Sequence, residues 1–131
     1  MQTSYFANLR NIPPGQRIVV IALYFPQWMP VAMRSSYEHA VELAPTTEML
    51  AQGRYRQDVY LALLASERGL TAQGIWERYG DAILICHEAN QMSCHRRMLA
   101  TWLEESLHVV IQESPRNVRG ATQKDEQLSF L

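Results

Sequence analysis

The fold of this chain is decided by the stretch Ile83-Leu84-Ile85-Cys86-His87-Glu88, which is followed six residues later by Cys94-His95-Arg96-Arg97. The apolar run before Cys86 is typical of a buried strand, and residues 98–107 have the apolar spacing of a helix. Both cysteines and two adjacent arginines therefore fall in the connection between strand and helix. In open α/β sheets, ligands bind beyond the carboxyl ends of the strands, so we expect a functional site here.

The segments around this stretch predict further strands and helices. Residues 17–25 form a continuous apolar run, as in a central parallel strand covered on both faces. Residues 3–6 and 108–111 are shorter candidates for the first and last strands, and residues 26–42 are predicted to form a long loop. Helices are expected after threonine caps near residues 46 and 71 and from Ser93 or Cys94 onward. This order predicts an α/β fold, a small three-layer sandwich with a mainly parallel sheet of three to five strands flanked by helices.

Length and composition bound the class of protein. The 131 residues suit one domain, predicted over residues 1–113, and the polar residues 114–131 are expected to form a flexible tail. A net charge of −1 disfavours a protein that grips duplex DNA through a broad basic face. We expect no membrane span and no signal peptide, and hence a cytoplasmic protein in which the two cysteines stay reduced.

The motifs of the chain also resemble a known family. Similar features are Leu84-Ile85-Cys86-His87-Glu88, Cys94-His95-Arg96-Arg97, Leu99-Ala100, Trp102-Leu103-Glu104-Glu105, the opening Thr3-Ser4-Tyr5-Phe6-Ala7, Pro13-Pro14 and Leu43-Ala44-Pro45-Thr46. Over roughly residues 1–113, they resemble domain-of-unknown-function family 488. The resemblance implies an α/β fold and a site at the cysteine motifs, but no reaction.

This chain departs from the commoner form of that family at one position. The common form has Asp-Val-Arg at the end of an early strand, where this chain has Leu23-Tyr24-Phe25. Arg34 is the residue that we expect to supply the missing cation.

The residues of the central motif suit chemistry on an anion. Cys94, His95 and Arg96 would lie at a helix N-terminus, where free N–H groups and the helix dipole favour a phosphate or a thiolate. We predict Glu88, Cys94 and His95 as catalytic residues: Glu88 and His95 would transfer protons, and Cys94 is the candidate nucleophile. Arg96 is predicted to bind the anion. Cys86, at the end of a buried strand, is predicted to be inert packing.

Two other interpretations of this motif remain open. In one, Glu88 and Arg96 form a structural ion pair and both cysteines only pack. In the other, Cys86, His87, Cys94 and His95 bind zinc. Neighbouring residues of a strand face opposite sides, so Cys86 and His87 would not readily reach one ion. We therefore predict no metal, and we predict no cofactor because the chain lacks a phosphate-cradling glycine loop.

Aromatic and basic residues gather in the segment that follows the central strand. Trp28 and Arg34 are predicted to bind substrate, because such groups stack on bases and contact phosphates. The alternative is a hydrophobic cluster beneath a long loop.

The last five residues suggest a partner. They resemble the short peptide by which bacterial replication and repair proteins bind the sliding clamp, and its predicted contacts are Gln127, Leu128, Phe130 and Leu131. Apolar anchors on a polar tether can enter a preformed groove. Alternatively, Phe130 and Leu131 fold back onto the domain.

Together these features predict an accessory protein of DNA or nucleotide metabolism. It would bind a nucleotide or single-stranded nucleic acid in a phosphate pocket, act as a hydrolase or transferase if it is an enzyme, and reach DNA through the sliding clamp. The competing hypothesis is a non-enzymatic adaptor or inhibitor, encoded by a phage or another mobile element, that binds the clamp or another host protein.

Overall fold

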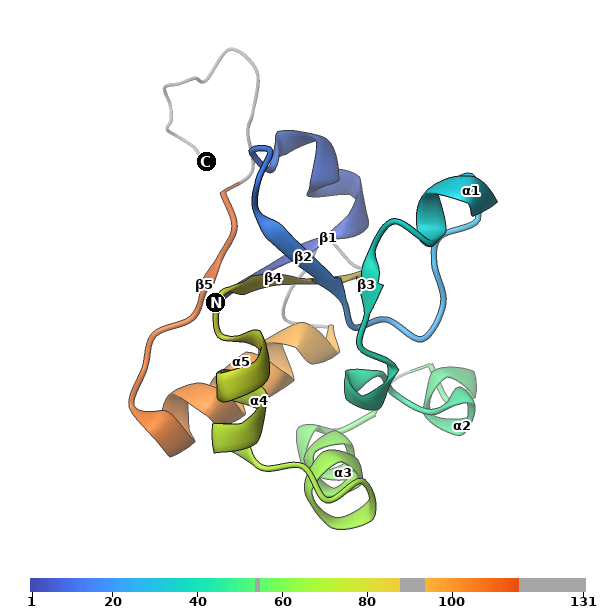
Figure 1. The fold of residues 1–131 in the computed structure, drawn as a ribbon. Coiled ribbons are helices and arrows are strands. Elements are labelled where there is room, and N and C mark those ends of the chain that lie inside the picture. The colour runs from blue at the N-terminus through green and yellow to red at the C-terminus, as the bar shows by residue number, and fades with distance from the viewer. Residues whose placement is uncertain (54, 88–93, 116–131) are drawn as a thin grey trace.

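A computed structural model describes residues 1–53, 55–87 and 94–115. It has one five-stranded, all-parallel sheet in the order β3-β2-β4-β1-β5 (Figure 1). The strands are β1 (Gln2–Tyr5), β2 (Arg17–Val20), β3 (Glu38–His39), β4 (Ala82–Cys86) and β5 (Gln112–Glu113). The predicted α/β fold is therefore confirmed.

The two faces of the sheet are covered unequally. One face carries three α-helices, which are α3 (Gln57–Ala62), α4 (Ala72–Tyr79) and α5 (His95–Leu107). Over the opposite face lies the 3-10 helix η1 (Phe6–Asn11), and the two layers are seen on either side of the strands in Figure 1. The connecting elements are α1 (Val31–Arg34), the 3-10 helix η2 (Val41–Leu43), α2 (Thr47–Ala51) and the π-helical turn η3 (Leu63–Glu67).

Local sequence explains where several of these elements begin. The side chains of Thr46 and Thr71 accept hydrogen bonds from the backbone N–H groups of Met49 and Gly74, which satisfies free donors at the starts of α2 and α4. Strand β4 is buried at all five positions, as expected for a central strand covered on both faces. Cys94 is the N-cap of α5, as predicted.

Three expectations about the secondary structure are wrong. Residues 26–42 contain α1 and β3 rather than one loop, and β2 ends at Val20. The last strand is the polar pair Gln112–Glu113 and not residues 108–111, because His108 takes a left-handed conformation and ends α5. The domain also continues past residue 113, because Ser114 is buried and its N–H donates to the carbonyl of Thr3.

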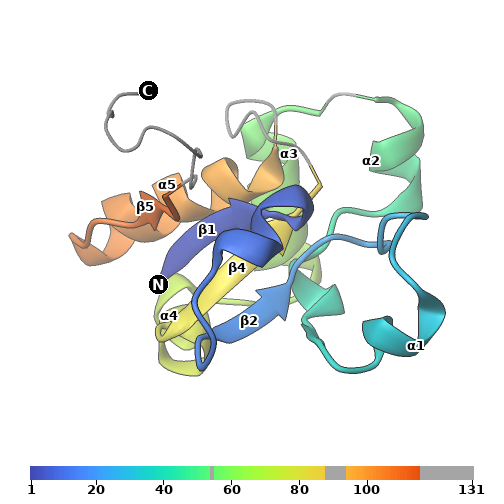
Figure 2. The ribbon, with the colours of Figure 1, turned by 90° about the horizontal axis from the view of Figure 1, so that it is seen from above.

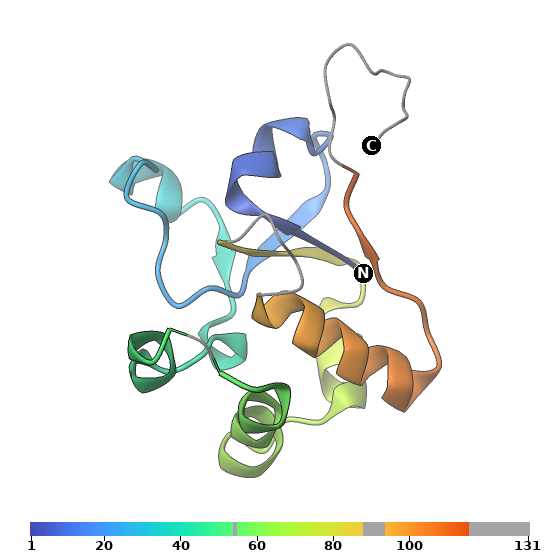
Figure 3. The same ribbon diagram turned by 180° about the vertical axis from the view of Figure 1, so that it is seen from behind.

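The connections that leave the neighbouring strands β1 and β4 lie on opposite faces of the sheet. These neighbouring strands are parallel, with Tyr5 opposite Cys86 at their carboxyl ends. After β1 the chain continues into η1 on one face of the sheet. After β4 it continues into α5 on the other face (Figure 3). In Figure 2 the arrowheads of β1, β4 and β2 point the same way. Such a point, where adjacent connections diverge, is where open α/β sheets bind ligands.

Candidate functional site

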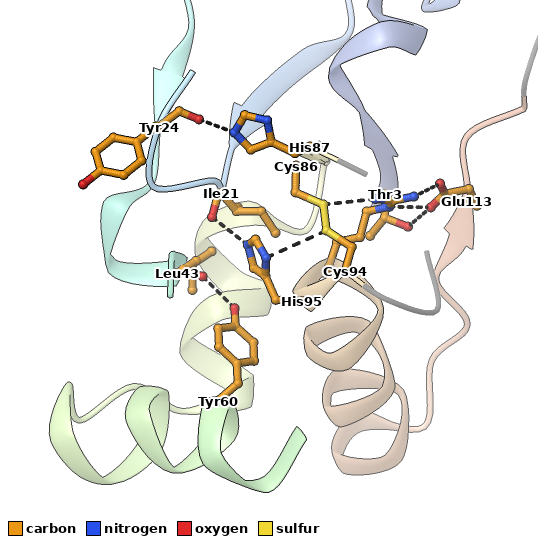
Figure 4. Close-up of a disulfide and its surroundings, with 11 residues drawn as sticks. Thr3, Ile21, Tyr24, Leu43, Tyr60, Cys86, His87, Cys94, His95 and Glu113 are labelled. Carbon is orange, nitrogen blue, oxygen red and sulfur yellow. Dashed lines mark hydrogen bonds and ion pairs between the residues drawn. A yellow bond between two sulfur atoms is a disulfide. The ribbon is translucent and has the colours of Figure 1, made fainter. Parts of the chain in front are cut away.

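A disulfide lies at the carboxyl end of β4. It joins Cys86, the last residue of β4, to Cys94, the N-cap of α5 (Figure 4). The expectation that both cysteines are reduced is wrong for this state, and so is the interpretation of Cys86 as inert packing. Cys86 is fully buried, and Nη1 of Arg96 donates to its sulfur over 3.0 Å. We call Cys86, Cys94, His95, Arg96 and Glu113 the thiol cluster.

His95 is held in one tautomer by the backbone of the segment after β2. Its Nε2 lies 2.8 Å from the carbonyl oxygen of Ile21 (Figure 4). A carbonyl oxygen only accepts, so Nε2 carries the proton and, in the neutral ring, Nδ1 carries the lone pair. Nδ1 lies 3.8 Å from the sulfur of Cys94. The buried ring of Tyr60 meets His95 edge-on at 5.4 Å between centroids, and the Tyr60 hydroxyl donates to the carbonyl of Leu43.

Burial keeps His95 neutral. Desolvation is the main cause that lowers its pKa to about 4; Arg96 and His87 lower it further, and the hydrogen bond to Ile21 opposes the shift. A group with this pKa is neutral at pH 7 and does not donate a proton there. The neutral ring offers a lone pair to Cys94, and the predicted role of His95 in proton transfer stays a prediction.

Arg96 forms a buried ion pair with Glu113. Its side chain is fully buried, and Nε and Nη2 donate to the two carboxylate oxygens of Glu113 over 3.1 and 2.7 Å. The hydroxyl of Thr3 donates to the same carboxylate, and the Arg96 guanidinium lies over the ring of Tyr5. The described contacts direct this guanidinium at Glu113, Cys86 and Tyr5, and its predicted anion-binding role stays a prediction. The guanidinium ties α5 to the edge of the sheet.

His87 points away from the thiol cluster. It is exposed, and its Nε2 lies 2.6 Å from the carbonyl oxygen of Tyr24 (Figure 4). Its ring packs edge-on against Phe6. Cys86 and His87 face opposite sides because side chains alternate along a strand. The four-ligand zinc set is therefore excluded by His87. The predicted catalytic residue Glu88 lies outside the described residues, as does any pairing of it with Arg96.

A small cavity lies beside the reactive side chains. Its volume is about 90 Å³, which leaves room for water but not for a nucleotide. Cys94 lines it and Cys86 does not. None of the described residues that line it is an arginine, lysine or carboxylate; they are Ala22, Leu23, Tyr24, Pro45, Leu50, Gly53, Tyr55, His87, Cys94 and His95.

The structure does not bring Trp28 and Arg34 into this cavity. Trp28 is 63% exposed and lines a separate groove of about 540 Å³. Arg34 donates to the carbonyls of Pro26 and Met29 and so holds the loop before α1. Phe6 lines the groove and His87 lines the cavity. The rings of these two residues contact each other.

Two residues of the site went unpredicted. Tyr60 is fully buried, whereas its neighbour Val59 is exposed, although valine is the more apolar of the two. Glu113 was placed at the end of the domain without a role. The only sequence feature that points to Glu113 is its position just after an apolar run. Its partner Arg96 lies 17 residues earlier in the chain, so local spacing does not predict the ion pair.

Comparisons with known proteins return no match among family models, curated proteins or solved structures. The resemblance to family 488 therefore rests on the motif residues alone. In the described part of the chain, no helix combines the length and apolar character needed to cross a membrane. Gln127, Leu128, Phe130 and Leu131, the residues predicted to bind the clamp, lie outside the described residues.

Proposed function

We propose that this domain is a thiol–disulfide oxidoreductase in which Cys94 is the reactive thiol and Cys86 its buried partner. The observation that carries the proposal is the disulfide between a strand end and a helix start, in which Cys94 lines a cavity and Cys86 is fully buried. Cys94 is itself 5% exposed, but it faces the cavity, whereas Cys86 does not. A sulfur that a small substrate can approach, beside a sheltered second sulfur, is the arrangement that thiol–disulfide exchange requires.

The reaction proceeds in two exchanges. The Cys94 thiolate attacks one sulfur of a substrate disulfide, forms a mixed disulfide and releases the other sulfur as a thiolate, which takes up a proton. The Cys86 thiolate then attacks the sulfur of Cys94, releases the second substrate thiol and forms the Cys86–Cys94 disulfide. Two electrons pass from the protein to the substrate, which leaves as two thiols. An external dithiol restores the reduced protein by the reverse exchanges.

The surroundings of the two sulfurs suit these roles. Cys94 caps a helix of 13 residues, and the positive end of the helix dipole stabilises a thiolate there. Arg96 donates to Cys86, so a cation faces the second sulfur. The cavity is small and lacks charged groups among its described lining residues, which favours a slender disulfide over a bulky or highly charged substrate.

A trapping experiment tests this proposal. Reduced protein is mixed with bis(2-hydroxyethyl) disulfide, quenched with acid and analysed by mass spectrometry. We expect Cys86→Ser to accumulate a mixed disulfide on Cys94, and Cys94→Ser to react at least about tenfold more slowly, because its remaining thiol is fully buried and does not line the cavity. Equal reaction rates of the two variants would overturn the assignment.

Binding of an unpaired base is a second role, proposed for the groove that Trp28 lines. The groove also has Tyr37 and Arg10 in its wall, so it offers aromatic faces beside a cation, and its volume is in the range of small-ligand pockets. With a labelled single-stranded oligonucleotide, Trp28→Ala should weaken binding about tenfold. Trp76→Phe, on α4, is the control that should leave binding unchanged. Equal binding by both variants would contradict this role.

Recruitment to the sliding clamp remains a proposal that rests on the terminal peptide. Deletion of residues 127–131 should abolish capture of the chain by immobilised clamp. Undiminished capture after this deletion would reject the proposal.

A further inference from the structure

We infer that the reduced site binds one Zn²⁺ ion through Cys86, Cys94 and His95. The inference rests on the proposed function in one respect, because the Cys86–Cys94 disulfide must be reducible. It adds Zn²⁺ as a ligand of the reduced site and a metal-bound state in which the thiols are blocked. A disulfide sulfur cannot serve as a thiolate ligand, so oxidation and zinc binding exclude each other.

The three candidate ligand atoms lie close enough together for one ion to reach all of them once the disulfide is reduced. Among the described residues, the two sulfurs and one ring nitrogen of His95 lie within 4.8 Å of one another. Zinc–sulfur bonds of about 2.3 Å and zinc–nitrogen bonds of about 2.0 Å, in tetrahedral geometry, place ligand atoms roughly 3.5–3.8 Å apart. Cys94 Sγ and His95 Nδ1 lie 3.8 Å apart. Reduction frees each sulfur to take its own position around the ion.

The tautomer of His95 is the one that such a site needs. Its Nε2–H donates to the carbonyl of Ile21, which leaves Nδ1, the nitrogen on the side of Cys94, with the lone pair. Histidine ligands usually donate their second N–H to a carbonyl or carboxylate in this way, and the bond fixes the ring. Tyr60 packs edge-on against the same ring and limits its rotation.

The charges balance inside this buried region. Zn²⁺ with two thiolates and a neutral imidazole has no net charge, and the neighbouring Arg96–Glu113 pair is also neutral. The N–H group that Arg96 directs at Cys86 would then donate to a metal-bound thiolate. Burial of the ion therefore leaves no uncompensated charge.

The described ligands leave one tetrahedral position for another donor. The cavity of about 90 Å³ is lined by Cys94 and His95, and it has room for a water molecule at that position. Zinc with two cysteines, one histidine and an open position is typical of catalytic rather than structural sites. The inferred site therefore exposes the ion to small ligands while it blocks both thiols.

Metal titration of the reduced, chelator-treated full chain tests the inference. Co²⁺ is the optical probe, and Zn²⁺ is then added to displace it. We expect one Co²⁺ per chain, with thiolate charge-transfer absorption, and complete displacement by one equivalent of Zn²⁺. The oxidised protein should bind neither ion. Absence of thiolate charge-transfer absorption with fully reduced protein would overturn the inference.

Two histidine variants provide matched controls, because each histidine directly follows a cysteine. His95→Ala should weaken Co²⁺ and Zn²⁺ binding at least about tenfold, whereas His87→Ala should stay within about twofold. Equal effects of the two changes would overturn the ligand assignment. Circular dichroism checks that each variant is folded.

A thiol count on the wild-type chain separates this inference from the proposed function. The chain has two cysteines, so every thiol signal comes from this site. A Cys86–Cys94 disulfide that a dithiol cannot reduce would overturn both proposals. If the dithiol reduces the disulfide but Zn²⁺ does not protect the two resulting thiols from alkylation, the zinc site alone is overturned. Protection of both thiols by one equivalent of Zn²⁺ supports it.

Discussion

Two clusters of arginines and carboxylates in this domain use the same groups in opposite environments. At the amino end of β2, Arg17 bridges Glu38 and Asp81, with all three side chains at least 34% exposed. We call these residues the surface cluster. In the thiol cluster, Arg96 is fully buried and holds Glu113 with two hydrogen bonds. The surface cluster lies in solvent, so we expect its contribution to stability to change with pH and salt. The thiol cluster is shielded from solvent, so we expect its contribution to change with the redox state of its cysteines.

Removal of each arginine is the strongest test of this difference. Arg96→Ala leaves a partly buried carboxylate without its cation and should lower the free energy of unfolding by about 3–5 kcal/mol. Arg17→Ala should have a several-fold smaller effect, because solvent screens its ion pairs. Urea denaturation of both variants measures this difference. If both variants lost a similar free energy of unfolding, burial would not explain a difference between the two clusters.

Reduction of the disulfide is the next largest perturbation. The bond closes a loop with a sequence separation of 8, for which chain entropy predicts a contribution of about 2–3 kcal/mol. Urea midpoints with and without a dithiol should differ accordingly, and a Cys86→Ser/Cys94→Ser double variant should be insensitive to the reductant. A wild-type midpoint that the dithiol leaves unchanged would contradict the prediction.

Alkaline pH should act on the region around the surface cluster. Tyr79 stacks with Arg17 and donates to Glu42; burial and that hydrogen bond raise its pKa from 10.0 to about 12. The folded-state pKa is the higher one, so the stabilisation is complete below pH 10 and is lost as pH rises from 10 to 12.

The loss should be about 2 kcal/mol, measured as unfolding free energy against pH. Tyr79→Phe should lose less stability over this range than the wild type. Identical profiles of the two proteins would contradict the assignment.

The smallest effect should appear in acid. Hydrogen bonds from Arg17 lower the pKa of Glu38 and of Asp81, so their contribution is present above their ordinary values of 4.5 and 3.8 and disappears as pH falls below them. Arg17→Ala should therefore make stability less dependent on pH in this range. An unchanged acid limb of the stability profile would show that these ion pairs contribute nothing measurable.

The sequence predicted the parts of the fold that depend on local pattern. Continuous apolar runs located β2 and β4, and the caps at Thr71 and Cys94 located the starts of α4 and α5. Strand β5 was placed wrongly because its residues are polar and its pairing with β1 is a tertiary contact.

The site was predicted only in part, for the same reason. Alternation along β4 correctly separated Cys86 from His87, and the helix start placed Cys94 and His95 together. The sequence does not show that Glu113 neutralises Arg96, or that the backbone after β2 fixes the tautomer of His95, because both contacts join distant segments.

Redox titration of the wild-type chain in glutathione buffers tests the central claim most directly, with the thiol state mapped by mass spectrometry of its peptides. We predict that Cys86 and Cys94 lose their thiols together in one reversible two-electron step and are recovered as the Cys86–Cys94 disulfide. Stable glutathionylation of Cys94 while Cys86 remains a thiol, or two thiols that stay reduced across the whole series, would contradict the account.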